Sequence, residues 1–210
     1  PVDFVKGVRE LCDKHGILLI LDEIQSGYCR TGKMFASEHF GVVPDIMTMG
    51  KAIAGGLPMS AIASTEEIMS HWAPGMHGTT FGGHPVCAAA ALAVLDLIEE
   101  EHILDNVNTQ GAYLKSRLQE MQEKYPIMGD VRGLGLMVAV SFRNPEDDSP
   151  SAEMLQKVAK YCLDHKMLTL SCGVHGNGFR FATALNVTKE ELDEGLKIFE
   201  AAVADAAAQR

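Results

Sequence analysis

The sequence lacks several features that mark common classes of protein. It has no apolar run that reaches the roughly 18 residues needed to span a bilayer, and it shows no signal or transit peptide. It also lacks a basic excess, because its formal net charge is −10. A surface that binds the phosphate backbone of a nucleic acid needs such an excess. We therefore expect neither a membrane nor a nucleic acid as a partner.

The cysteines and histidines lack the spacing of a disulfide framework or a metal site. The five cysteines are an odd number and include no Cys-x-x-Cys pair. The eight histidines show no metal-ligand spacing, so we predict no metal. A reducing compartment is the simplest interpretation, and we expect a cytoplasmic protein, with a mitochondrial location left open. Because the chain starts at Pro1 and a helical pattern begins almost at once, we expect that an N-terminal part has been lost, together with any targeting information it held.

The first half alternates helical and strand-like patterns. This alternation predicts an α/β domain with a parallel or mixed sheet. The segment 17–21 is apolar throughout, which is typical of a strand covered on both faces. The pattern predicts helices over 4–15, 34–40 and 86–101, and strands over 17–21, 45–49 and 59–63.

The second half has the character of a smaller α+β domain. We place the boundary near residue 98, which gives a first domain of residues 1–98 and a second of residues 99–210. One long strand is expected over 131–142, with Gly133 and Gly135 permitting close packing or a bulge. The other expected elements are helices over 108–124, 152–165 and 189–208, and strands over 168–171 and 179–182.

Two of the predicted strands end in an ionisable residue. Strand 17–21 runs into Asp22, and strand 45–49 is followed by Gly50 and Lys51. Strand ends are where an α/β sheet opens to ligands, so this pairing suggests an active-site rim. A lysine that can form an imine, with a carboxylate nearby, is the minimum equipment for pyridoxal phosphate chemistry. Gln25 offers a neutral donor in the same loop as Asp22.

Each of these residues also has an ordinary structural interpretation. Asp22 could simply cap the turn that follows it, and most lysines are solvated surface charges. Thr80 lies in a threonine- and glycine-rich segment before a helix, where hydroxyls and amides can hold a phosphate or form a plain N-cap. Arg180 stands between two phenylalanines in a strand, where it suits a substrate carboxylate, although a structural ion pair is the alternative.

Taken in order, these segments resemble the class III pyridoxal-phosphate-dependent aminotransferases. The resemblance extends over essentially all 210 residues. Within that family the sequence looks most like the 4-aminobutyrate aminotransferases. The segments that carry the resemblance are Leu21–Gly27 with Arg30–Gly32, Pro44–Pro58, Thr79–Leu92, and Ser171–Arg180.

The resemblance implies the fold type I transferase fold, with part of the large domain followed by the small C-terminal domain. It implies that Lys51 forms the Schiff base with pyridoxal 5′-phosphate and that Asp22 pairs with the pyridinium nitrogen. Gln25 would lie near the ring oxygen of the cofactor. Thr80 would bind the cofactor phosphate of the neighbouring subunit, so a homodimer is the smallest complete enzyme. Arg180 would bind the carboxylate of glutamate or 2-oxoglutarate.

Two departures from the family pattern bear on the substrate. His84 stands where the family often has Asn or Ser, and the stretch after Arg180 lacks the usual proline. The assignment to another class III enzyme therefore stays open. The alternatives are an aminotransferase for a different ω-amino acid or a diamine, an aminomutase, and a racemase. A non-catalytic fragment that lacks the N-terminal half is a further alternative. A nucleotide-binding domain fits poorly, because no G-x-G-x-x-G follows the first strand.

Overall fold

The computed structural model describes residues 2–208. The chain divides into two compact units, one ending at Leu104 and the other starting at Asp105. The division falls in the first turn of helix α5 (Ile103–Lys124), and the domain boundary near residue 98 stays a prediction. Within the described chain, no helix has both the length and the apolar character needed to cross a membrane.

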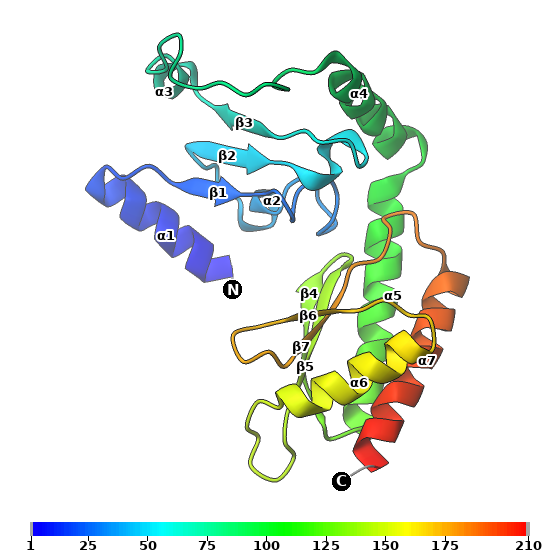
Figure 1. Ribbon diagram of the computed structural model, residues 1–210. Coiled ribbons are helices and arrows are strands. Elements are labelled where there is room, and N and C mark those ends of the chain that lie inside the picture. The colour runs from blue at the N-terminus through cyan, green and yellow to red at the C-terminus, as the bar shows by residue number, and fades with distance from the viewer. Residues whose placement is uncertain (1, 209–210) are drawn as a thin grey trace. The chain divides into compact units, whose positions relative to one another are not determined.

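The first unit is built on a three-stranded sheet in the order β1-β2-β3. Strands β1 (Ile20–Asp22) and β2 (Ile46–Met49) are parallel, whereas β3 (Ala61–Ser64) runs antiparallel to β2. The three strands lie side by side in Figure 1. The helices of this unit are α1 (Val2–His15), α2 (Ser37–Phe40), the 3₁₀ helix η1 (Lys51–Ala54), α3 (Glu66–Met69) and α4 (Pro85–Glu100).

Helix α1 is tied to the beginnings of both parallel strands. It ends at His15, and the left-handed φ of 61° at the following Gly16 turns the chain toward β1. Arg9 on this helix donates to the carboxylate of Asp45 at 2.8 Å, and the same carboxylate oxygen accepts the amide of Leu19 at 2.6 Å. These two bonds hold down the pKa of Asp45, the amide contributing most and the guanidinium second. They fix the beginnings of β1 and β2 relative to each other.

The core of the first unit lies between α4 and η1. Its buried centre consists of Tyr28, Ile53 and Ala54, against which α4 packs Ala90, Ala91, Val94 and Ile98. The expectation that segment 17–21 is covered on both faces is wrong for this chain. Ile17, Leu18 and Ile20 are each more than half exposed. The reason is that the described residues leave much of these side chains uncovered. The position of β1 at the edge of the sheet leaves its backbone, rather than its faces, without a neighbouring strand.

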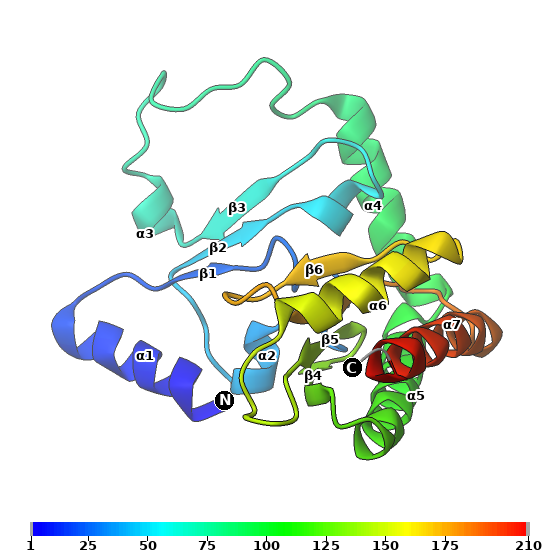
Figure 2. The same ribbon diagram turned by 60° about the horizontal axis from the view of Figure 1, so that its bottom comes forward.

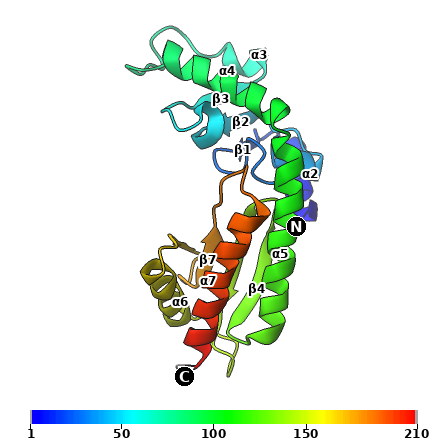
Figure 3. The ribbon, with the colours of Figure 1, turned by 90° about the vertical axis from the view of Figure 1, so that its right-hand side faces the viewer.

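The second unit is a four-stranded antiparallel sheet in the order β4-β5-β7-β6, packed with three helices. Helix α6 lies across strands β5 to β7 in Figure 2, and α5 runs beside α7 in Figure 3. Phe142, Phe179, Phe181 and Phe199 form an aromatic cluster between sheet and helix. The remaining elements are β4 (Met128–Leu134), β5 (Met137–Phe142), α6 (Ala152–Asp164), β6 (Leu170–Cys172), β7 (Gly178–Phe181) and α7 (Lys189–Ala208).

The single strand expected over 131–142 is instead a β-hairpin. Gly133 and Gly135 have φ of 142° and 52°, values that let the chain reverse between β4 and β5. A Cβ on Gly133 would lie 2.1 Å from the carbonyl oxygen of Met137, so only glycine fits there. Leu136 sits in the turn but is fully buried, which explains why the apolar pattern runs through it without a polar turn signal.

Candidate functional site

The ends of the two parallel strands place Asp22 in contact with the β2 segment. Asp22 is the last residue of β1 and stands in register with Thr48 of β2. Its carboxylate oxygen Oδ1 accepts the hydroxyl of Thr48 at 3.2 Å and the backbone amide of Ile24 at 2.9 Å. The side chain is exposed, so the carboxylate is held from two sides and still open to a ligand. Gln25 lies three residues further on, half-buried in the same loop.

Lys51 begins η1, three residues after Thr48. Gly50, just before it, packs against the side chain of Ile24, because a Cβ there would meet Ile24 Cγ2 at 3.4 Å. The loop that carries Asp22 and the segment that carries Lys51 are therefore adjacent. Lys51 is exposed, and its amine makes no hydrogen bond or ion pair with any other residue the structure describes. An exposed primary amine close to an oriented carboxylate is chemically suited to bind an aldehyde covalently.

The backbone around these strand ends is unusual. Lys51 has a φ of 47°, and Tyr28 and Cys29 have φ of 53° and 71°. Non-glycine residues rarely adopt this left-handed region, and such conformations gather at functional sites. Tyr28 and Cys29 are also buried, and burial raises the pKa of both side chains. The sequence did not predict the left-handed backbone at these three positions.

Glu23, the neighbour of Asp22, is a buried acid that the sequence pattern did not single out. Strand alternation turns it away from Asp22, and it is only 2% exposed. Its carboxyl oxygens accept the hydroxyl of Ser26 and the backbone amide of Ser37, the latter at 2.8 Å. The available clue to this arrangement was Ser26, three residues after Glu23, the acid that directly follows the strand.

Thr80 lies in the irregular segment between α3 and α4, and it is exposed. A pocket of about 780 Å³ lies along this segment, and it is lined by residues 58–60, 77–79, 81–84 and Cys87. Thr80 itself is not part of the lining. The role given to it, contact with the phosphate of a neighbouring subunit, stays a prediction.

Arg180 belongs to the second unit, in the middle of β7, with Ala139 and Leu170 as its cross-strand neighbours. It lines a pocket of about 570 Å³ formed by residues 167–170 and 179–183. Its Nε atom is buried without a hydrogen-bond partner, and the side chain forms no ion pair with the residues the structure describes. A guanidinium left in this state beside a pocket is suited to donate hydrogen bonds to a carboxylate.

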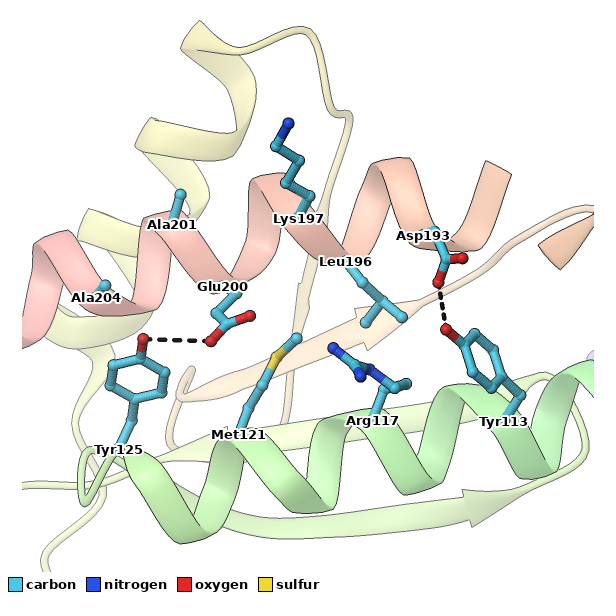
Figure 4. A pocket seen from close by; sticks show the side chains of 10 residues that line it. All are labelled: Tyr113, Arg117, Met121, Tyr125, Asp193, Leu196, Lys197, Glu200, Ala201 and Ala204. Carbon is cyan, nitrogen blue, oxygen red and sulfur yellow. Dashed lines mark hydrogen bonds between the residues drawn. The ribbon is translucent and has the colours of Figure 1, made fainter. Parts of the chain in front are cut away.

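A second groove in this unit holds none of the predicted site residues. It lies between α5 and α7 and has a volume of about 590 Å³ (Figure 4). Tyr113 and Tyr125 close it at either end by donating to Asp193 and Glu200. Asp193 and Glu200 of α7 accept these hydrogen bonds, whereas Arg117 pairs with Glu120 of its own helix and keeps a buried Nε atom without a hydrogen-bond partner.

The comparisons with known proteins identify the family. A sequence profile of the family described as "Aminotransferase class-III" matches residues 1–203. The chain is 44% identical to the 5-aminovalerate aminotransferase DavT of Pseudomonas putida over 207 residues, which are 99% of this chain and 49% of DavT. It is 41% identical to the 4-aminobutyrate aminotransferase GabT of Escherichia coli, with 93% of this chain and 46% of GabT covered.

The solved structures agree with this assignment. A transaminase from the marine bacterium Virgibacillus superposes with a TM-score of 0.92 at 31% identity, covering 100% of this chain and 50% of the other. The mixed α/β architecture is that of part of a fold type I enzyme, as the sequence predicted. The chain spans about half the length of the curated relatives it matches. The resemblance inferred from the motifs is confirmed: the chain belongs to the class III aminotransferases.

Proposed function

We propose that this chain carries the catalytic lysine of a pyridoxal-phosphate-dependent aminotransferase that moves an amino group from an ω-amino acid to 2-oxoglutarate. The single observation that supports it most is the adjacency of the two loops at the strand ends. Thr48 donates to Asp22, and Ile24 packs on Gly50 directly beside Lys51. Membership of the family supplies the reaction class.

The residues at the strand ends fit the cofactor. Bound pyridoxal 5′-phosphate supplies an electron sink for the carbon that loses a proton. The Asp22 carboxylate, open to solvent and oriented by two donors, would hold a proton on the pyridine nitrogen. The Lys51 amine would attach the cofactor and then, once released from it, would move the proton from the amino-bearing carbon of the substrate to the cofactor. Gln25 would orient the ring from the same loop as Asp22.

Arg180 is our candidate for the carboxylate end of the substrate. Its guanidinium would form a two-bonded fork with glutamate or 2-oxoglutarate, since both carry a carboxylate beside the reacting carbon. In a ping-pong reaction the amino donor and 2-oxoglutarate use the site in turn, so one arginine serves the acceptor half-reaction. A second candidate donor is 5-aminovalerate, one carbon longer than 4-aminobutyrate, because the relative named for it is among the most similar.

We also propose that the working site needs more than these 210 residues. Ile17, Leu18 and Ile20 are more than half exposed, and within the described chain β1 and β3 each have one edge with no neighbouring strand. The remaining length that the relatives have would cover this surface. Thr80 would reach the cofactor phosphate of a neighbouring subunit, which makes a homodimer the smallest active assembly. The 210-residue chain alone is expected to be inactive.

The experiment uses the complete enzyme, meaning this chain together with the remaining length found in its relatives. Borohydride reduction after loading with pyridoxal phosphate should leave a permanent mass increase on the peptide that contains Lys51. Lys51→Ala should abolish both the label and turnover, whereas the matched variant Lys33→Ala, at another exposed lysine, should retain both. Unchanged activity of Lys51→Ala with an ω-amino acid would contradict the proposal.

The donor and the rival class III reactions are separated by a second assay. Consumption of 2-oxoglutarate is measured with 4-aminobutyrate, 5-aminovalerate, diamines and α-amino acids in parallel. An aminotransferase consumes one 2-oxoglutarate for each amine, whereas an aminomutase or a racemase changes its substrate without consuming any. The donor with the highest kcat/KM identifies the substrate.

A further inference from the structure

The buried carboxyl group of Glu23 is not used by the chemistry proposed above. A carboxyl group that is 2% exposed is costly unless its oxygens are hydrogen-bonded. In this chain both oxygens are engaged by uncharged donors, one by the Ser26 hydroxyl and the other by the Ser37 amide at 2.8 Å. Ser37 is the first residue of α2, so the side chain joins the loop after β1 to that helix.

The backbone of the same residue is held as well. Its amide donates to the carbonyl of Thr48 at 2.9 Å, and its carbonyl accepts the amide of Gly27 at 2.9 Å. Gly27 is required for this turn, because a Cβ there would lie 2.8 Å from the Glu23 carbonyl oxygen. Glu23 is thus fixed through four hydrogen bonds to three different segments: its own turn, β2 and α2.

The fixed turn is the one that carries the two predicted ring contacts. Asp22 directly precedes Glu23, and Gln25 lies inside the turn that the Gly27 amide closes. Asp22 also accepts the amide of Ile24 from this turn. Any rotation of the turn therefore moves the Asp22 carboxylate. Charge-assisted hydrogen bonds depend steeply on distance and angle, so a small displacement weakens the bond to a ring nitrogen.

We propose that Glu23 is a positioning residue that sets the orientation of Asp22 and Gln25 toward the cofactor ring. This inference rests on the proposed function. Glu23 does not touch the ring; it acts through the turn. Loss of its side chain frees the turn from α2 and lets Asp22 move away from the line of the ring nitrogen. Supporting groups of this kind change affinity or activity by about 10- to 100-fold when removed.

The test compares two glutamates that accept backbone amides in the same segment. Glu38 accepts the amide of Phe35 at 2.8 Å, but it is exposed and has no bond to the Asp22 turn. Glu23→Ala in the complete enzyme should raise the Kd for pyridoxal phosphate about tenfold and lower kcat by about 10- to 100-fold. Its KM for the amino donor should change far less, because Glu23 does not contact substrate. Glu38→Ala should leave all three values within about twofold.

Two further readouts separate positioning from a general loss of stability. The pH at which the absorbance of the bound cofactor changes should shift in Glu23→Ala and stay fixed in Glu38→Ala. In the complete enzyme without cofactor, amide exchange at Ile24 and Gly27 should be faster in Glu23→Ala than in Glu38→Ala. Glu23→Gln, which still accepts the Ser37 amide, should recover most of the wild-type values. Should Glu23→Ala not fold, Ser26→Ala removes one bond and should show the same changes at smaller size.

The outcomes distinguish this inference from the proposed function. A wild-type enzyme that fails to bind pyridoxal phosphate overturns the proposed function and this role with it. A wild type that binds normally, with Glu23→Ala equal to Glu38→Ala in Kd, kcat and absorbance pH, overturns the role of Glu23 alone. A lower melting temperature as the sole effect of Glu23→Ala assigns that residue to the fold and also overturns the proposal.

Discussion

We predict that the Arg180 side chain lowers the free energy of unfolding of the chain and that it binds a substrate carboxylate. Its Nε atom is buried without a hydrogen-bond partner, although the rest of the side chain is half-buried beside a pocket. A buried donor left without a partner costs about 1–3 kcal/mol. Arg180→Met keeps a long unbranched stem in the same place and removes the donor. The unfolding free energy of the variant should therefore rise by about 1 kcal/mol.

The assay is urea unfolding of the 210-residue chain. With a slope of about 2 kcal/mol per molar urea, a gain of about 1 kcal/mol moves the midpoint upward by about 0.5 M. In the complete enzyme the same variant should lose the two-bonded fork to 2-oxoglutarate. At about 3 kcal/mol that loss raises the KM for 2-oxoglutarate about 100-fold, while the affinity for pyridoxal phosphate stays unchanged. Arg180→Lys keeps the charge without the fork and should recover only part of the affinity.

A fall in the urea midpoint of Arg180→Met would refute this reasoning. It would mean that the guanidinium stabilises the folded chain. If the midpoint rises while the KM for 2-oxoglutarate stays unchanged, the stability prediction holds and the substrate prediction is wrong. The buried Nε donor would then destabilise the chain without binding the substrate.

Three further predictions concern helix glycines, the hydroxyl of Thr48 and the carboxylate of Asp45. Gly111→Ala should destabilise the chain by about 1–3 kcal/mol, because its Cβ would lie 2.4 Å from the backbone of the β4–β5 turn. Gly195→Ala should stabilise the chain by about 0.5–1 kcal/mol, because a Cβ at this position in α7 meets open space. Urea unfolding measures both differences. Thr48→Val should weaken pyridoxal phosphate binding about tenfold in an equilibrium titration, and Thr48→Ser, which keeps the hydroxyl bonded to Asp22, should not. The folded pKa of Asp45 is lowered, so its stabilising contribution is present above its unfolded pKa near 4 and is lost as the pH falls through the lower folded value. Across that acid range, the stability difference between wild type and Asp45→Asn should therefore shrink, as melting curves at successive pH values would show.

The elements with a strong period were predictable, and the hairpin was not. Helix α7 covers Lys189–Ala208, the same range that its apolar repeat indicates. The β4–β5 turn escaped prediction because it carries Leu136 into the core, so hydrophobic residues continue where a polar turn is expected. Apolar patterning indicates burial, and here one residue of the turn, Leu136, is buried. The clue lay in Gly133 and Gly135, whose positive φ requires glycine.

The exposed strand has a different explanation. The apolar run Ile17–Leu21 predicts a covered strand, yet much of it faces solvent in this chain. An apolar run predicts that its side chains are buried, but it does not say which part of the protein covers them. The covering part can lie far away in the sequence. Because the chain spans about half the length of its relatives, the proposed cover is the remaining length they have. A sequence pattern can therefore be right about the complete protein and wrong about the chain at hand.

The neighbouring acids Asp22 and Glu23 show which part of the candidate site could be predicted from the sequence and which could not. Both are carboxyl side chains, and they are neighbours, so composition and spacing treat them alike. The alternation of a strand turns one toward solvent and the other into the protein. The exposed carboxylate, held by Thr48 and the Ile24 amide, is left open to a ligand, whereas the buried one binds Ser26 and Ser37 and stabilises the turn. An exposed acid that must keep one orientation needs a rigid backbone beneath it, and the buried acid next to it provides that rigidity.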